Sequence, residues 1–140
     1  MKAVLEVTMD CRDAGRLADF WTEAVGYSYL PWPGEFASQG EWIESRVDPA
    51  DDDGLRVRYL HDPEGGAPFL CLLEVPEPKT VKNRLHFDVN VGGDGNADEK
   101  WERITAERDR LVPIGATVVK EYDHDHITMG DPEGNEFDLC

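Results

Sequence analysis

Three short segments carry an acidic or imidazole side chain between apolar neighbours. Glu6 lies within AVLEVTMDC, His86 within RLHFDVNV and Asp138 within NEFDLC. Each segment alternates apolar and polar residues, which is typical of a half-buried strand. Because the apolar neighbours must face a core, the three polar side chains face the opposite side. Carboxylate and imidazole groups bind divalent ions and transfer protons, so these residues are candidates for chemistry.

A simpler interpretation of His86 is that it is a hydrogen-bonded core residue, with Asp88 or Asn90 as its partner. However, burying several acidic and imidazole groups together without a cation costs free energy, unless their pKa values shift. The residues therefore leave two hypotheses open, a metal site and a metal-free cavity.

A helix is predicted after each of the first two alternating segments. In the first half, Asp13 suits the N-cap, apolar residues recur at helical spacing from Leu17 to Val25, and Gly26 suits the C-terminal end. In the second half, Asp98 is the expected N-cap and Pro113 ends the helix. Extended segments are expected at residues 41–47, 55–60 and 69–75, and again at 116–122, 126–130 and 135–140.

The sequence DPEG occurs twice, beginning at Asp62 and at Asp131. Proline and glycine suit a tight turn, so each copy is predicted to connect the last two strands of its half. The same turn within the same order of elements predicts two tandem β-α-β-β-β modules, at about 1–75 and 84–140. A crossover at 76–83 joins them into a single domain of 140 residues, and residues 31–54 are expected to form a loop with one edge strand.

The composition excludes several classes of protein. Acidic residues outnumber basic ones 30 to 14, giving a net charge of −16. Nucleic acids and anionic membranes bind positively charged proteins, so this acidic protein is not expected to bind either of them. Three cysteines without a CxxC pair, together with an N-terminus that lacks a long apolar run, predict a cytoplasmic protein without disulfides.

The whole chain resembles the vicinal oxygen chelate superfamily, which includes glyoxalase I, bleomycin-resistance proteins and extradiol dioxygenases. It is most similar to the glyoxalase-like subgroup, in the stretches VTMDCRDAGRLADFW, VPEPKTVKNRLHFDV and GDPEGNEFDLC. The resemblance implies an α+β fold in which two tandem β-α-β-β-β modules form curved mixed sheets around a central cavity.

The resemblance also implies a metal site, with ligands on the first and last strands of each module. These positions are Glu6, His86 and Asp138, and the fourth is either Leu73 or Glu74. Aligning the two turns places Leu73 toward the cavity, whereas a shift of one residue would place Glu74 there. Such a set suits Mn²⁺, Fe²⁺, Ni²⁺ or Zn²⁺. A cavity that binds no metal remains an equal alternative.

The resemblance implies a small-molecule enzyme, a metal-dependent lyase or isomerase or a dioxygenase-type enzyme, with Glu6 or Asp138 as the catalytic base. The alternative is a metal-free protein that binds a small molecule, as in antibiotic resistance. Asp88, Trp32, Trp42 and Leu73 are the expected substrate contacts, although the tryptophans could instead anchor a loop. A homodimer is expected, as is common in similar proteins.

Two further histidines, His124 and His126, lie in the sequence DHDH. They could share one face of a strand and bind a metal ion there. A hairpin turn is expected at this point of the second half, however, so the segment is predicted to be an exposed polar turn.

Overall fold

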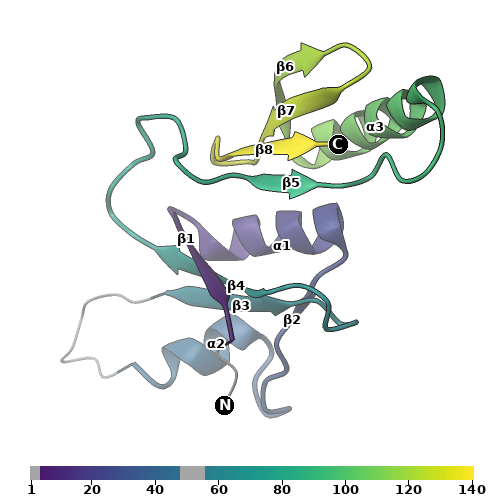
Figure 1. Cartoon of the computed structure of the whole chain (residues 1–140). Coiled ribbons are helices and arrows are strands. Elements are labelled where there is room, and N and C mark those ends of the chain that lie inside the picture. The colour runs from purple at the N-terminus through teal and green to yellow at the C-terminus, as the bar shows by residue number, and fades with distance from the viewer. Residues whose placement is uncertain (1–3, 48–55) are drawn as a thin grey trace. The chain divides into compact units, whose positions relative to one another are not determined.

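A computed structural model describes residues 4–47 and 56–140 of the chain. The chain divides into two compact units, Met1–Pro78 and Lys79–Cys140, and the division falls within the expected crossover. Each unit has its own four-stranded sheet and its own long helix (Figure 1). In the part that the structure describes, no helix is long and apolar enough to cross a membrane.

The first unit follows the predicted order of elements, with one additional helix. In the sheet, the strands lie in the order β1-β4-β3-β2, and β1 is parallel to β4 while the other pairs are antiparallel. The elements are β1 (Glu6–Cys11), α1 (Ala14–Val25), β2 (Ser28–Tyr29), α2 (Gln39–Glu44), β3 (Val57–His61) and β4 (Phe69–Glu74).

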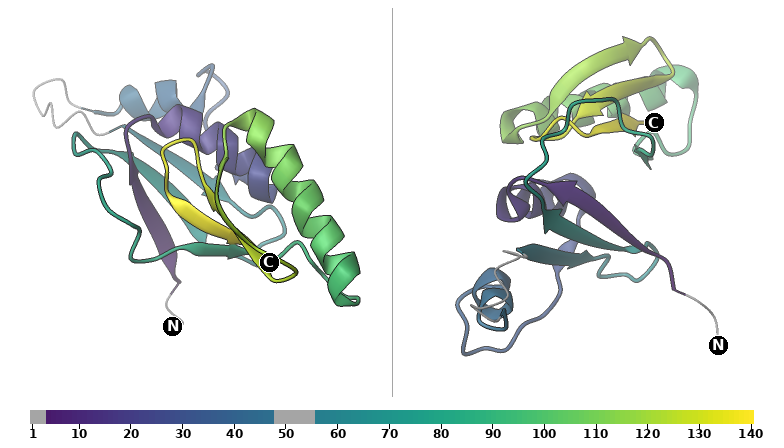
Figure 2. Two further views of the ribbon diagram at one scale, coloured as in Figure 1. Left: turned by 90° about the horizontal axis from the view of Figure 1, so that it is seen from above. Right: turned by 90° about the vertical axis from the view of Figure 1, so that its left-hand side faces the viewer.

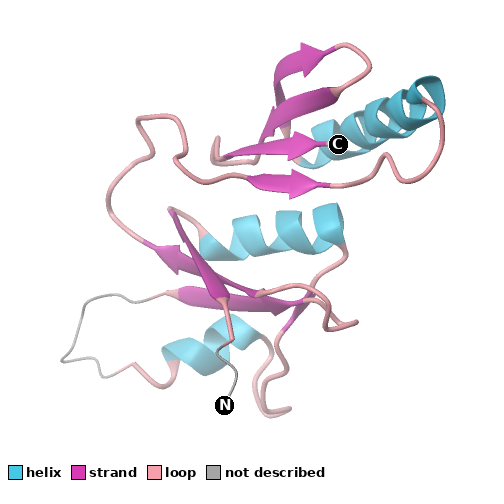
Figure 3. Ribbon diagram, in the orientation of Figure 1, coloured by secondary structure: helices cyan, strands magenta, loops and turns pink. Residues whose placement is uncertain are grey.

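The second unit repeats this topology. Its strands lie in the order β5-β8-β7-β6, again with one parallel pair, β5 with β8. The elements are β5 (Phe87–Val89), α3 (Ala97–Leu111), a 3₁₀ turn η1 (Val112–Ile114), β6 (Thr117–Tyr122), β7 (His126–Gly130) and β8 (Glu136–Leu139). The described residues therefore form the expected α+β fold, with two mixed sheets built from a repeated module (Figure 3).

One face of each sheet packs against the long helix of its own unit (Figure 2). Burying a large apolar side chain stabilises a fold by about 1.5–3 kcal/mol, so these layers hold each unit together. In the first unit the buried side chains include Leu17, Phe20, Trp21, Leu60, Leu70 and Leu72. In the second they include Ile104, Leu111, Ile127, Met129, Phe137 and Leu139.

Helix α1 begins and ends where the sequence predicts. The Asp13 side chain accepts a hydrogen bond of 2.9 Å from the Arg16 amide, which satisfies a free donor of the first turn. At the other end, Gly26 adopts a left-handed conformation with φ of 71°. A residue without a Cβ atom adopts this conformation at little cost, so the helix stops there.

Helix α3 begins two residues earlier than expected. Its N-cap is Asn96, not Asp98, because Asn96 and Glu99 form a reciprocal capping box. Asp98 lies in the first turn, where its negative charge interacts favourably with the positive end of the helix dipole. Trp101 on this helix is half-buried and stacks on His124.

The two DPEG sequences form the connections β3–β4 and β7–β8, as predicted. In both, the leading aspartate, Asp62 or Asp131, accepts hydrogen bonds from the amides two and four residues further along the chain. Gly65 and Gly134 both have positive φ, 75° and 80°. Hydrogen bonds from the Glu64 amide and its neighbours lower the pKa of Asp62, so this turn favours the charged form.

The segment 41–47 was expected to be extended, but most of it is helical. Ser38 caps α2 by accepting a hydrogen bond from the Glu41 amide, and Glu41 in turn accepts one from the Ala37 amide. The buried Gln39 bonds to the main chain of Tyr59 on β3 and so fixes this helix to the sheet. The second strand of the unit is instead β2, and the sequence DPADDDG (48–54) lies outside the described residues.

Candidate metal site

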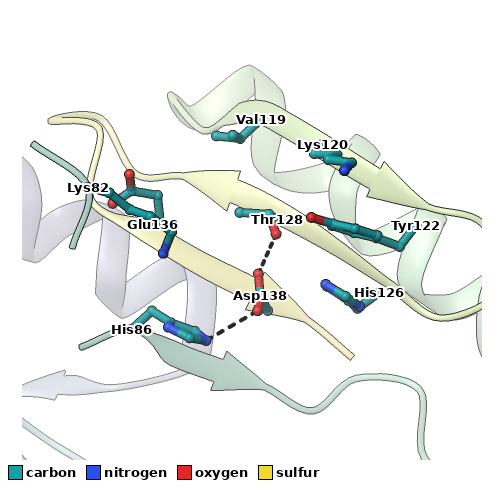
Figure 4. Close-up of a pocket in the computed structure, with 9 residues that line it drawn as sticks. All are labelled: Lys82, His86, Val119, Lys120, Tyr122, His126, Thr128, Glu136 and Asp138. Carbon is teal, nitrogen blue, oxygen red and sulfur yellow. Dashed lines mark hydrogen bonds and ion pairs between the residues drawn. The ribbon is translucent and has the colours of Figure 1, made fainter. Parts of the chain in front are cut away.

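A histidine and two aspartates come together on one face of the second sheet. His86 directly precedes β5, Asp88 lies within β5, and Asp138 lies within β8. His86 Nε2 lies 3.4 Å from Asp88 Oδ1 and 3.3 Å from Asp138 Oδ2. One ligand atom from each residue lies within 4.8 Å of the other two. Figure 4 shows the contact between His86 and Asp138.

Strand register explains why these side chains meet. Asp88 on β5 is the direct partner of Asp138 on the parallel strand β8. Phe137 and Leu139 are buried, so Asp138 between them points to the face away from the core. His86 and Asp88 are two residues apart and share that face. Asp88 was predicted to contact substrate, and the structure places it beside two predicted ligands, His86 and Asp138.

Thr128 on β7 orients the Asp138 carboxylate. Its hydroxyl group donates a hydrogen bond of 2.7 Å to Asp138 Oδ1, while Oδ2 faces His86. The Asp138 side chain is only 17 % exposed, so few water molecules compete for this bond. A carboxylate held at one oxygen presents the other in a fixed direction, as metal sites require.

The three residues fit a divalent ion. When metal–ligand bonds are about 2.0–2.2 Å long, neighbouring ligand atoms lie about 3 Å or slightly more apart. The measured separations of 3.3 and 3.4 Å are close to this value. Two carboxylates directly opposite each other on neighbouring strands repel, and a cation offsets this repulsion. One imidazole nitrogen with carboxylate oxygens suits Mn²⁺, Fe²⁺, Ni²⁺ or Zn²⁺.

Cys140 follows β8 but is a poor candidate ligand. Burial raises the pKa of its thiol, and the Asp88 and Asp138 carboxylates raise it further. The thiolate is the form that binds metals, and it is disfavoured at neutral pH.

Two of the candidate ligands, His86 and Asp138, border a hollow of about 430 Å³ on the same face of the sheet (Figure 4). This volume suits a small molecule. Most of the lining was not predicted from the sequence, although the alternation within β6 and β7 carries some of the signal. The hollow is lined by Lys82, His86, Val119, Lys120, Tyr122, His126, Thr128, Glu136 and Asp138.

Glu136 is an ion-paired member of this lining. Its carboxylate lies 3.2 Å from Lys79 Nζ and accepts a hydrogen bond of 3.0 Å from the Asn83 amide. Burial alone would raise the pKa of Glu136, but these contacts outweigh burial and lower it. The Glu136 charge is therefore largely compensated within its own unit.

Residues 123–125 of the DHDH segment form the turn between β6 and β7, whereas His126 is the first residue of β7. The two histidines therefore have different surroundings. His124 stacks on Trp101 with ring centroids 5.6 Å apart. His126 stacks on Tyr122 at 4.2 Å and lines the hollow. Among the described residues, neither histidine belongs to a group of three potential metal ligands.

The remaining predicted ligands lie in the first unit. Glu6 is exposed on β1, on the face opposite to the buried Cys11. Leu73 shares this face of the sheet, because Asp10 is its register partner on the neighbouring strand. Glu74 turns toward α1, where its carboxylate accepts a hydrogen bond of 3.0 Å from the Ala14 amide. The register therefore agrees with the interpretation that places Leu73, not Glu74, beside the polar residues of β1.

The two predicted tryptophans line separate hollows of the first unit. Trp42 borders a mostly apolar hollow of about 500 Å³ together with Tyr59, and the Arg46 guanidinium lies 5.5 Å from the centre of its ring. Trp32 borders a smaller one, and its indole nitrogen donates a hydrogen bond to the Phe36 carbonyl. Trp32 thus anchors its own loop, and Trp42 lines the more apolar hollow.

Comparison with known proteins identifies the family of the chain. A family model described as a glyoxalase-like domain matches residues 6–140. A comparison with curated proteins found no match.

Solved structures share the fold at low sequence identity. A point mutant of FosX, a fosfomycin resistance protein from Listeria monocytogenes, in complex with Mn(II) and 1S,2S-dihydroxypropylphosphonic acid, is 11 % identical, with a TM-score of 0.65 over 99 % of this chain and 91 % of that one. The trypanothione-dependent glyoxalase I of Leishmania major is 16 % identical, with a TM-score of 0.64 over 100 % and 86 %. A glyoxalase/bleomycin resistance protein/dioxygenase family enzyme from Burkholderia phytofirmans is 19 % identical, with a TM-score of 0.59 over 96 % and 94 %.

Proposed function

The chain belongs to the glyoxalase-like domain family, within the vicinal oxygen chelate superfamily, and from this we propose that it is a divalent-metal enzyme acting on a small molecule. One observation carries the proposal: ligand atoms of His86, Asp88 and Asp138 all lie within 4.8 Å of one another. The Mn(II) complex of FosX, which has a similar fold, supports it.

The residues of the second unit have distinct roles in this proposal. His86 and Asp138 bind the ion, and Asp88 binds it or compensates its charge. A bound ion would polarise oxygen atoms of the substrate and stabilise negative charge that develops on them. Thr128 holds one oxygen of Asp138, which leaves the other oxygen to bind the ion or to accept a proton. This chemistry corresponds to a lyase or isomerase. Glu6 stays a prediction as ligand and base, and the homodimer also stays a prediction.

Metal binding to the purified protein tests the proposal. Mn²⁺, Ni²⁺ or Zn²⁺ should raise the melting temperature of metal-free protein, because an ion that binds only the folded state stabilises it. At a concentration one hundred times Kd the gain is about 2.7 kcal/mol. Calorimetric titration should give one site per chain. His86→Ala and Asp138→Asn should abolish both effects.

A matched control uses another histidine of the same unit that has two acidic neighbours. His124 lies 2.8 Å from Asp123 and 3.2 Å from Asp98, but it lies outside the candidate set. His124→Ala should bind the ion as wild type does. The metal site at His86 would be refuted if His86→Ala bound the ion normally, or if His124→Ala lost it.

A metal-free binding protein is the second candidate, favoured by the apolar hollow at Trp42 and Tyr59. Such a protein would show no metal-dependent change in melting temperature, but it would bind apolar small molecules. Trp42→Ala should then weaken binding of an apolar fluorescent probe, whereas His86→Ala should not.

A further inference from the structure

Two lysines face the hollow that borders the candidate metal site. Lys82 precedes β5 and Lys120 lies on β6, and both line the hollow of about 430 Å³ with His86 and Asp138. The chain carries only 14 basic residues against 30 acidic ones. Because basic residues are the minority, two lysines in the lining of one small hollow are a local departure from the acidic composition of the chain.

Neither amine is neutralised within its unit. Of the acidic residues in the lining, Glu136 pairs with Lys79 at 3.2 Å, and Asp138 faces His86 and Thr128. In the described part of the chain, no carboxylate oxygen lies within 4 Å of either amine, that of Lys82 or that of Lys120. Their positive charges are thus available to a molecule in the hollow.

An irregularity in β6 directs Lys120 to this face. The register between β6 and β7 shifts between Val118 and Lys120, so that one additional residue, Val119, is inserted. Beyond the shift, Lys120 is paired with Thr128, whose side chain faces the candidate ligand Asp138. Both Val119 and Lys120 consequently line the hollow. Bulges commonly direct side chains in this way beside functional sites.

Lys120 is also restrained within the lining. Its amine lies 4.4 Å from the centre of the Tyr122 ring, which attracts a cation electrostatically. Tyr122 is itself stacked on His126. A restrained amine loses less conformational entropy when it binds an anion than a freely rotating surface lysine does.

We propose that the substrate carries an oxyanion group, a carboxylate, sulfonate, phosphonate or phosphate, and that Lys82 and Lys120 bind this group while the ion site binds the other end. The inference rests on the proposed function and adds to it the class of substrate. Charge-assisted hydrogen bonds between ammonium and oxyanion groups supply the affinity, and Tyr122 offers a hydroxyl group beside them.

A matched pair of probes tests this inference. Methanesulfonate and dimethyl sulfone differ only in that a charged oxygen replaces a methyl group, and neither chelates metal ions strongly. Each is titrated into Zn²⁺-loaded and metal-free protein, and binding is followed by amide chemical shifts in NMR spectra. Methanesulfonate should shift signals of β6 and β7, whereas dimethyl sulfone should not.

Charge-neutralising variants assign the binding to the two lysines. Lys82→Gln and Lys120→Gln should each weaken methanesulfonate binding about tenfold, which is the effect of losing one charge-assisted contact. Both variants should keep the Zn²⁺ affinity of wild type. Lys100→Gln, an exposed lysine on α3 outside the hollow, makes the same change in net charge and should bind the probe normally.

The outcomes separate this inference from the proposed function. Normal methanesulfonate binding by both Lys82→Gln and Lys120→Gln would overturn the inference, as would equal binding of dimethyl sulfone. If the wild-type protein binds no Zn²⁺, the proposed metal function fails. The metal-free titration then still decides whether these lysines form an oxyanion site.

Discussion

The Asp138 carboxylate divides its two oxygens between different partners. Oδ1 accepts the hydrogen bond from Thr128, and Oδ2 faces His86 Nε2 at 3.3 Å. Without the hydroxyl group of Thr128, the carboxylate could rotate, and binding an ion would then cost more conformational entropy. Thr128 is therefore a positioning residue for the proposed site.

Replacing this hydroxyl group should weaken metal binding without disturbing the fold. Thr128→Val keeps the shape and the β-branched character that suit a strand but removes the hydrogen bond. The Kd for Mn²⁺ should rise about tenfold or more, which is the usual effect of losing an outer-shell partner. Thr128→Ser keeps the hydroxyl group and should restore most of the affinity in a calorimetric titration. Equal affinities for the valine variant and wild type would show that Asp138 needs no such support.

Single residues could be assigned to a face from the sequence, but their neighbours could not. Alternation correctly places Asp138 on the face opposite to the buried Phe137 and Leu139. It was wrong for Leu5 and Leu85, the apolar neighbours of Glu6 and His86, because both are exposed. The proximity of Asp88 to Asp138 depends on the register between β5 and β8. The contact between Thr128 and Asp138 depends on the register between β7 and β8. Strands far apart in the sequence set these registers, so no local pattern reveals them.

At the scale of elements, local signals predicted α1 and the two DPEG turns because their capping groups are local. Helix α2 was not predicted, because local signals for it are weak. Its apolar residues are too few to show a helical period, and the contact that fixes it joins Gln39 to Tyr59, a residue distant in the sequence. The bulge in β6 was also not predicted, since it exists only relative to β7.

The N-terminus of α1 offers a test of the assignment of Glu74. Its carboxylate accepts a hydrogen bond from the Ala14 amide and adds negative charge where the helix dipole favours it. Glu74→Ala should lower the free energy of unfolding by about 1–2 kcal/mol in urea denaturation. Glu77→Ala, at an exposed position of the crossover, should change it little.

The same variant also separates the two interpretations of the fourth ligand position. Because Glu74 is held at α1, Glu74→Ala should keep the Mn²⁺ affinity of wild type. If Glu74→Ala lost Mn²⁺ binding but kept the stability of wild type, Glu74 would be a metal ligand and would not stabilise the N-terminus of α1.

At the scale of the whole molecule, the dominant property is the net charge of −16. A strongly acidic surface attracts cations and repels anions over roughly the Debye length. Metal ions are therefore concentrated near the protein, whereas an oxyanion substrate approaches against repulsion. The two lysines of the hollow would offset this repulsion locally, because an acidic protein needs nearby positive charge to bind an anion.

Salt should therefore weaken metal binding to the protein more than it weakens metal binding to a small chelator, which has no acidic surface around its ligands. Raising NaCl from about 0.01 M to about 1 M shortens the Debye length from about 30 Å to about 3 Å, which removes the contribution of distant carboxylates. The Kd for Mn²⁺ should rise steeply over this range. Nitrilotriacetate, a small chelator without a surrounding acidic surface, provides the control for the effect of salt on the ion itself. If the protein and the chelator lose affinity in parallel, the acidic surface contributes nothing to metal binding, and the ion is held by His86, Asp88 and Asp138 alone.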